Sequence, residues 1–183
     1  MRKVFIVTLA LSLVLLINNT NVYAQELTVG SSAVFLKPVT QETTDSRVRI
    51  LREFLEKYHS PLVPYAGTFV KTADKYNLDW KLVAAISGVE STFGNEIPDK
   101  SFNGWGWGIY GDNMIKFSSW TQGIETVSEG LRTKYINKWG AQDAYSIGRF
   151  YAASPTWAQR VTYFMNEIEE YRILSLANLS ISL

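Results

Sequence analysis

Residues 80–111 read WKLVAAISGVESTFGNEIPDKSFNGWGWGIYG, and this stretch decides the fold of the chain. It begins as an apolar helical segment that ends near Glu90, and it continues as a loop dense in glycine and aromatic residues. On a helical wheel of about 100° per residue, Glu90 falls between Ile86 and Val83, inside the apolar stripe. We therefore expect Glu90 to face the packed core, where ionisation is costly and the pKa is raised, as suits a general acid. The alternative is that Glu90 pairs with a buried cation.

The start of the chain has the pattern of an export signal. Residues 1–24 combine Arg2 and Lys3 with an apolar run over 4–17 and a small-residue end at 22–24. The run is shorter than the ~20 residues that span a bilayer, so an uncleaved anchor is the alternative. The chain has no cysteine, which suits a disulfide-free bacterial envelope protein. We expect a secreted or cell-envelope protein (periplasm or cell wall), with no stable membrane insertion after signal cleavage.

Charge and composition exclude several classes of function. The 18 basic residues, two of them in the predicted signal, nearly balance 17 acidic ones, so nothing indicates a nucleic-acid partner. No glycine-rich phosphate loop and no convincing Ser, His and acid set occur. We expect no cofactor and no metal, because the single histidine, His59, sits at a helix junction and is interpreted as structural. Six Trp and ten Tyr fit either sugar binding or the core of an α domain.

Helical periodicity covers most of the remaining chain and predicts one mainly α domain over residues 45–183. Residues 25–44 have no sustained period and are interpreted as a linker or N-terminal arm. Asp45 or Thr44 is the expected first helix cap, and Ser119 with Gln122 has the form of a capping box. The predicted helices start near residues 45, 62, 80, 119, 143 and 155.

The loop over residues 92–118 is too long for an ordinary connection, so we expect it to be functional or to contain short strands. Trp105 and Trp107 are two residues apart and interleaved with glycine, which predicts two rings on one side of an extended segment. Such rings suit a sugar subsite. The alternative is a glycine-rich hairpin pinned by tryptophan into the core.

Three segments resemble lysozyme-like peptidoglycan hydrolases, particularly soluble lytic transglycosylases, over roughly residues 62–171. Residues 84–94, AAISGVESTFG, are similar to the helix end where that family has a catalytic Glu followed by Ser, a variable residue and Phe. Residues 103–111, NGWGWGIYG, lie where the family has a Gly-rich segment ending in Gly-Leu-Met-Gln, and residues 150–154, FYAAS, lie where it has Ala-Tyr-Asn-Ala-Gly. The resemblance implies a lysozyme-like helical fold, with Glu90 as the catalytic acid.

The sequence also departs from this pattern. The Gln of Gly-Leu-Met-Gln is missing, and Ala152 replaces the Asn of the last segment. Residues 117–124, FSSWTQGI, look like a segment of bacterial endo-β-N-acetylglucosaminidases, which have the same helical core but cut the other glycan linkage. The expected substrate contacts are Ser91, Trp105, Trp107, Tyr110 and Tyr151. Tyr151 either orients Glu90 through its hydroxyl, as the family's tyrosine does, or is a core ring.

Glycosidic cleavage usually uses two carboxyl groups about 5 to 9.5 Å apart. Glu96, Asp99 and Asp112 are the loop's candidates for the second, although each reads more simply as a solvated charge. The resembled transglycosylases manage with one acid, because the substrate's N-acetyl group and 6-hydroxyl do the rest. We therefore expect an exported enzyme that cleaves peptidoglycan strands with Glu90 as general acid and base. The alternatives are an endo-β-N-acetylglucosaminidase and a non-catalytic glycan-binding module.

Overall fold

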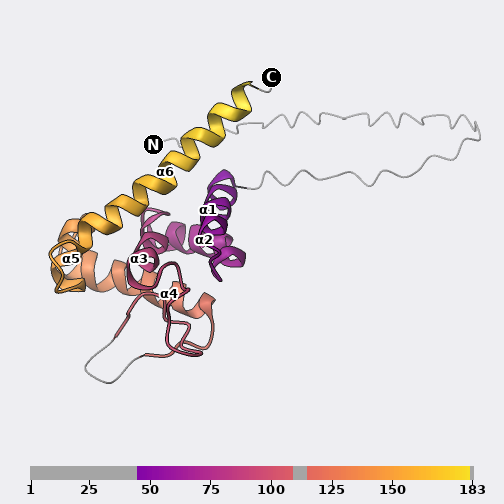
Figure 1. Ribbon diagram of the computed structural model, residues 1–183. Coiled ribbons are helices and arrows are strands. Elements are labelled where there is room, and N and C mark those ends of the chain that lie inside the picture. Colours follow the sequence, from indigo (N-terminus) through magenta and orange to yellow (C-terminus); the bar gives the residue numbers. More distant parts are fainter. Residues whose placement is uncertain (1–44, 109–114, 182–183) are drawn as a thin grey trace, which may run out of the picture. The chain divides into compact units, whose positions relative to one another are not determined.

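The computed structural model describes residues 45–108 and 115–181, with side chains as far as residue 175 in the last helix. The predicted signal over residues 1–24, the predicted arm over 25–44 and Tyr110 lie outside the described residues. The described part is mainly helical and contains no strand, which confirms the predicted fold class (Figure 1). The loop that follows α3 therefore has no strand in its described portion.

The elements follow one another along the chain with short connections, except for the long loop between α3 and α4. They are α1 (Ser46–Lys57), the 3₁₀ turn η1 (Val63–Tyr65), α2 (Ala66–Tyr76), α3 (Leu82–Ser91), α4 (Trp120–Gly130), the π-helical η2 (Leu131–Lys138), α5 (Ala144–Tyr151) and α6 (Trp157–Ile181).

Helix caps form where the sequence predicts them. The Asp45 carboxylate accepts a hydrogen bond from the Arg47 amide at 2.9 Å, so it caps α1. The Ser119 hydroxyl accepts one from the Gln122 amide at 3.2 Å at the start of α4. The second half of that predicted capping box is displaced by one residue, because the Gln122 side chain accepts from the Ser118 amide instead.

Helix α3 is the central element of the core. Every residue from Leu82 to Gly88 is buried, and the helix packs against α6, α2 and α4. Its alanines and its lack of proline favour helix formation, while the surrounding elements cover all of its sides. The helix ends because Thr92 adopts a left-handed conformation with φ of 50°. The last turn of α3 thus emerges from the core just where Glu90 lies.

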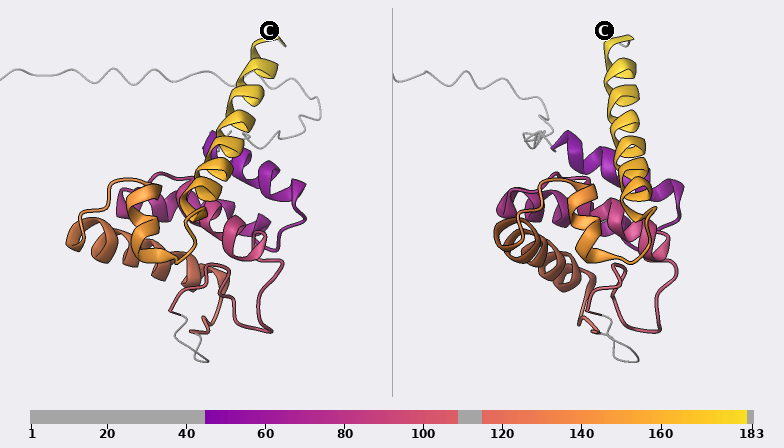
Figure 2. Two further views of the ribbon diagram at one scale, coloured as in Figure 1. Left: turned by 60° about the vertical axis from the view of Figure 1, so that its left-hand side comes forward. Right: turned by 90° about the vertical axis from the view of Figure 1, so that its left-hand side faces the viewer.

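Helix α6 packs against α3, α5 and α1 (Figure 2). Its first turn places buried Trp157 and Ala158 beside the other helices. None of the helices in the described ranges is both long and apolar enough to cross a membrane. The start of α6 and the end of α3 together frame the candidate site.

Candidate active site

Glu90 is held by a tryptophan from the start of α6. The indole Nε1 of Trp157 donates a hydrogen bond of 2.6 Å to Glu90 Oε1, and Trp157 itself is only 2% exposed. A buried indole N–H needs an acceptor, so this contact satisfies Trp157 as well as fixing one carboxylate oxygen. Because Oε1 accepts from the indole, Oε2 is left to carry the proton when the group is in its acid form.

The environment of Glu90 contains opposing influences on its ionisation. Burial of the carboxyl group raises its pKa above the ordinary value of a glutamate, while the Trp157 hydrogen bond and the charge of Arg160 both act to lower the pKa. Arg160 is fixed nearby, because its guanidinium donates to the Val89 carbonyl at 3.2 Å. The net result is a raised pKa, in the direction that suits a general acid.

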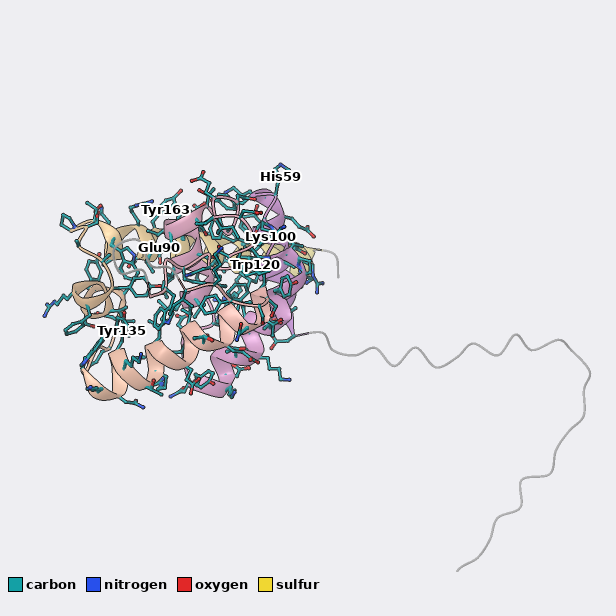
Figure 3. All side chains as sticks on the ribbon, turned by 90° about the horizontal axis from the view of Figure 1, so that it is seen from below. His59, Glu90, Lys100, Trp120, Tyr135 and Tyr163 are labelled. Carbon is teal, nitrogen blue, oxygen red and sulfur yellow. The ribbon has the colours of Figure 1, made fainter. Side chains whose placement is uncertain are left out.

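The helical-wheel prediction for Glu90 was wrong in one respect. The residue is exposed instead of facing the core, although its carboxyl group is partly enclosed by neighbours. The wheel treats α3 as having one apolar face, whereas the helix is buried on all sides from Leu82 to Gly88, and in its last turn Ser91 is buried while Glu90 is exposed. The elements that pack around this last turn therefore decide the exposure of Glu90. Figure 3 labels Glu90 together with Tyr135 of η2.

Tyr151 supports this arrangement indirectly. Its ring stacks on Trp157 with centroids 4.7 Å apart and an interplanar angle of 23°, and its hydroxyl donates to the Trp105 carbonyl at 2.7 Å. The predicted direct orientation of Glu90 by this hydroxyl is therefore wrong. Burial raises the pKa of Tyr151, and the negative charge of Glu90 raises it further. Tyr151 positions Trp157, and Trp157 holds Glu90.

Trp105 is a core residue, and its predicted role as a sugar platform was wrong. The side chain is completely buried, and its Nε1 donates to the Val83 carbonyl at 2.9 Å. The segment is not extended between the two tryptophans, because Gly106 has a φ of 59°, in the left-handed region. The chain turns there, so the rings of Trp105 and Trp107 go to different surroundings.

Ser91 is also structural, which corrects its prediction as a substrate contact. It is 2% exposed, its hydroxyl donates to the Gly104 carbonyl at 2.7 Å, and the same oxygen accepts from the Gly94 amide at 2.9 Å. The side chain joins the end of α3 to the glycine-rich loop. Its contribution is to hold that loop beside Glu90.

Trp107 is half-buried and does reach a cavity. Its ring centroid is 5.9 Å from those of Tyr135 and Tyr151. The ring lies directly over Gly130, where an added Cβ would come within 2.3 Å of it. Asn103 fixes the backbone of this residue, accepting from its amide at 3.0 Å and donating to its carbonyl at 2.9 Å.

The cavity beside Trp107, which we call the aromatic cleft, has a volume of about 540 Å³. Glu90 does not line this cleft, but Tyr151 does, and Tyr151 stacks on Trp157, the residue that donates a hydrogen bond to Glu90. Trp139 and Phe150 are 41% and 53% exposed, with centroids 5.1 Å apart. The residues that line the cleft are Gly106, Trp107, Gly108, Ile115, Lys134, Tyr135, Lys138, Trp139, Phe150 and Tyr151.

Sequence reasoning missed several of these residues. In the sequence, Trp139 stands at the end of a helical stretch and Trp157 belongs to the apolar stripe of the last helix, so neither position indicates a function. The signal that could have found Trp157 is its indole N–H, because a buried tryptophan needs a hydrogen-bond acceptor. No comparable signal marks Trp139, since its place beside the cleft depends on how η2 packs.

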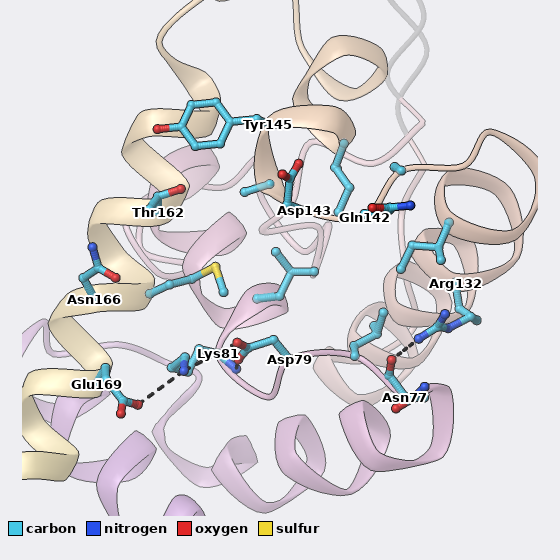
Figure 4. Close-up of a pocket in the computed structure, with 17 residues that line it drawn as sticks. Asn77, Asp79, Lys81, Arg132, Gln142, Asp143, Tyr145, Thr162, Asn166 and Glu169 are labelled. Carbon is cyan, nitrogen blue, oxygen red and sulfur yellow. Dashed lines mark hydrogen bonds and ion pairs between the residues drawn. The ribbon is translucent and has the colours of Figure 1, made fainter.

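A larger cavity, of about 700 Å³, lies elsewhere, where the start of α3 meets η2, α5 and α6 (Figure 4). Its charged groups already have partners: Lys81 is 3.3 Å from Glu169, and Arg132 donates to the backbone carbonyls of Tyr76 and Asn77. Glu90 does not line this cavity. Size alone therefore does not identify the candidate site.

The described residues provide no clear second carboxylate. Glu96 and Asp99 are exposed, and neither contributes to the pKa shift of Glu90, while Asp112 lies outside the described residues. Comparison of the sequence with protein-family models and with curated proteins finds no match. The geometry around Glu90 is therefore the feature of this chain that bears on its function.

Proposed function

We propose that this chain is an exported glycosidase or lytic transglycosylase that cuts the glycan backbone of peptidoglycan, with Glu90 as general acid and then general base. The observation that carries this proposal is the Trp157–Glu90 contact of 2.6 Å, because Trp157 fixes a carboxyl group of raised pKa and also stacks on Tyr151, which lines the aromatic cleft. A fixed carboxyl group of raised pKa, connected through aromatic rings to a cleft, suits general acid catalysis of glycosidic cleavage.

In the first step, the proton on Glu90 Oε2 passes to the glycosidic oxygen as the bond from the anomeric carbon to that oxygen breaks. The carbon gains oxocarbenium character, and the leaving sugar departs as an alcohol. Glu90 becomes ionised at this moment. The Trp157 hydrogen bond and the positive charge of Arg160 then favour the new carboxylate, since both stabilise the charged form.

In the second step, the Glu90 carboxylate accepts a proton from the incoming nucleophile. In a hydrolase this nucleophile is water, and in the resembled transglycosylases it is the 6-hydroxyl of the substrate. We propose the second route, in which groups of the substrate itself do the work of a second carboxylate.

The test is digestion of purified peptidoglycan by the mature protein, followed by mass spectrometry. We expect 1,6-anhydromuramic ends. Reducing N-acetylglucosamine ends would instead indicate an endo-β-N-acetylglucosaminidase, and reducing muramic ends a hydrolytic lysozyme. Absence of cleavage would contradict the enzyme proposal and leave a glycan-binding module.

The matched variant is Glu90→Gln, which keeps the shape of the side chain and removes its proton. We expect the rate to fall by at least the ~10² to 10⁴ typical of a general acid, with fold and glycan binding retained. Full activity in this variant would show that Glu90 is not the acid.

A further inference from the structure

The aromatic cleft combines flat rings with two lysines. Lys134 and Lys138 both lie on η2, four residues apart, and both line the cleft. Trp107, Trp139 and Phe150 provide aromatic surface within the same 540 Å³ cavity. Rings of this kind pack against the C–H faces of sugars, while an ammonium group pairs with an anion.

Among the described residues, the two lysines of this cleft form no ion pair. Neither Lys134 nor Lys138 has a carboxylate within ion-pair distance in the described ranges, and the described lining contains no acidic residue. The 700 Å³ cavity behaves differently, since its lysine, Lys81, contacts both Asp79 and Glu169. A general excess of basic residues does not explain the difference, because the whole chain is close to neutral. The lysines are thus left available to a charged ligand.

We propose that the aromatic cleft is a subsite for a sugar ring that carries a carboxylate on its substituent, the ring lying against the aromatic side chains and the carboxylate meeting Lys134 and Lys138. This inference rests on the proposed function and specifies which part of a strand binds there. In peptidoglycan one of the two alternating sugars carries a lactyl ether, which ends in a carboxylate or in a peptide with free carboxylates. The other sugar is neutral. The cleft therefore selects strands by charge as well as by ring shape.

The size of the effect follows from the exposure of the lysines. Both are solvent-exposed, so each pairing is screened and worth far less than a buried ion pair. Two such pairings are expected to lower the Kd of a carboxylate-bearing glycan about fivefold to tenfold relative to a neutral one. This difference in Kd should become smaller as salt is added.

The experiment measures binding by calorimetry with the mature Glu90→Gln protein, so that cleavage does not interfere. Three probes are compared: neutral chitotetraose, a peptidoglycan tetrasaccharide freed of its peptides and ending in lactyl carboxylates, and the same tetrasaccharide with its peptides. We expect tighter binding of a carboxylate-bearing probe than of chitotetraose. If the tetrasaccharide without peptides binds more tightly than chitotetraose, the lactyl carboxylate is the group that the lysines bind. If only the tetrasaccharide with peptides binds more tightly, the peptide carboxylates are that group.

Lys134→Gln with Lys138→Gln should abolish this preference, whereas replacing both lysines by Arg should retain it. The matched control is Lys71→Gln with Lys75→Gln, another exposed pair four residues apart, on α2. The proposal would be overturned if the Glu90→Gln protein bound all three probes with equal affinity. It would also be overturned if replacing Lys134 and Lys138 by Gln left the preference for carboxylate-bearing probes unchanged.

The two proposals fail in different ways. A wild-type protein that cleaves peptidoglycan but shows no lysine-dependent preference refutes the subsite alone. A protein that binds carboxylate-bearing glycan through Lys134 and Lys138 but cleaves nothing refutes the enzyme and supports the subsite.

Discussion

Trp157→Phe is the substitution that most directly tests how the site works. It removes the N–H that donates to Glu90 Oε1 at 2.6 Å while keeping a ring to stack on Tyr151, whose centroid lies 4.7 Å away. A hydrogen bond to a charged group contributes about 1.5–3 kcal/mol. If the bond acts fully on the carboxylate that forms during cleavage, its loss lowers kcat about 10- to 150-fold.

The pH profile gives a second, independent readout. The Trp157 hydrogen bond lowers the pKa of Glu90 against the larger effect of burial, so removing the bond raises the pKa further. Because the first step needs the protonated acid, activity declines as pH rises through this pKa. The alkaline limb of the profile is therefore expected to move to higher pH in Trp157→Phe.

The assay is the rate of soluble fragment release from purified peptidoglycan, measured across pH for wild type and variant. Trp80→Phe is the matched control, since Trp80 packs beside Lys81 and makes no hydrogen bond to Glu90 among the described contacts. Circular dichroism checks that both variants fold. A folded Trp157→Phe protein with a wild-type rate and an unmoved alkaline limb would refute the assigned role of Trp157.

Three further predictions follow from the described contacts. Glu90→Gln should gain stability relative to wild type as pH rises. The raised folded-state pKa of Glu90 gives the wild-type protein stability that is present below about pH 4.5 and is lost as pH rises through the folded pKa, whereas glutamine does not titrate. Thermal unfolding of both proteins from about pH 4 to about pH 8 measures this, and a difference in stability that stays constant with pH would contradict it. Gly130→Ala should displace the Trp107 ring, because two of its atoms would lie 2.3 and 2.7 Å from the new Cβ. We expect the free energy of unfolding to fall by about 1–3 kcal/mol and glycan binding to weaken. An unchanged tryptophan fluorescence spectrum would count against this prediction. Trp105→Ala should cost about 3–5 kcal/mol of unfolding free energy in denaturant melts, whereas Trp107→Ala should mainly weaken glycan binding; the reverse order would show that the two rings have been assigned wrongly.

The sequence by itself determined the helical architecture and most of its boundaries. Local signals were sufficient there, because a cap such as Asp45 or Ser119 acts within three residues of its own position. The amphipathic stripes of α1, α2 and α4 likewise depend on the order of residues along one helix. The sequence also singled out Glu90, through its place at a helix end before a glycine-rich loop.

Only the tertiary structure decided what surrounds Glu90 and which aromatic residues remain accessible. Trp157 lies 67 residues from Glu90, so no periodic pattern could reveal their hydrogen bond. Trp105 and Trp107 are chemically alike and two residues apart, yet a left-handed turn at Gly106 sends one into the core and leaves the other beside the cleft. The physical reason is that burial and partner choice depend on contacts between distant segments, whereas caps and periodicity depend on neighbours along the chain.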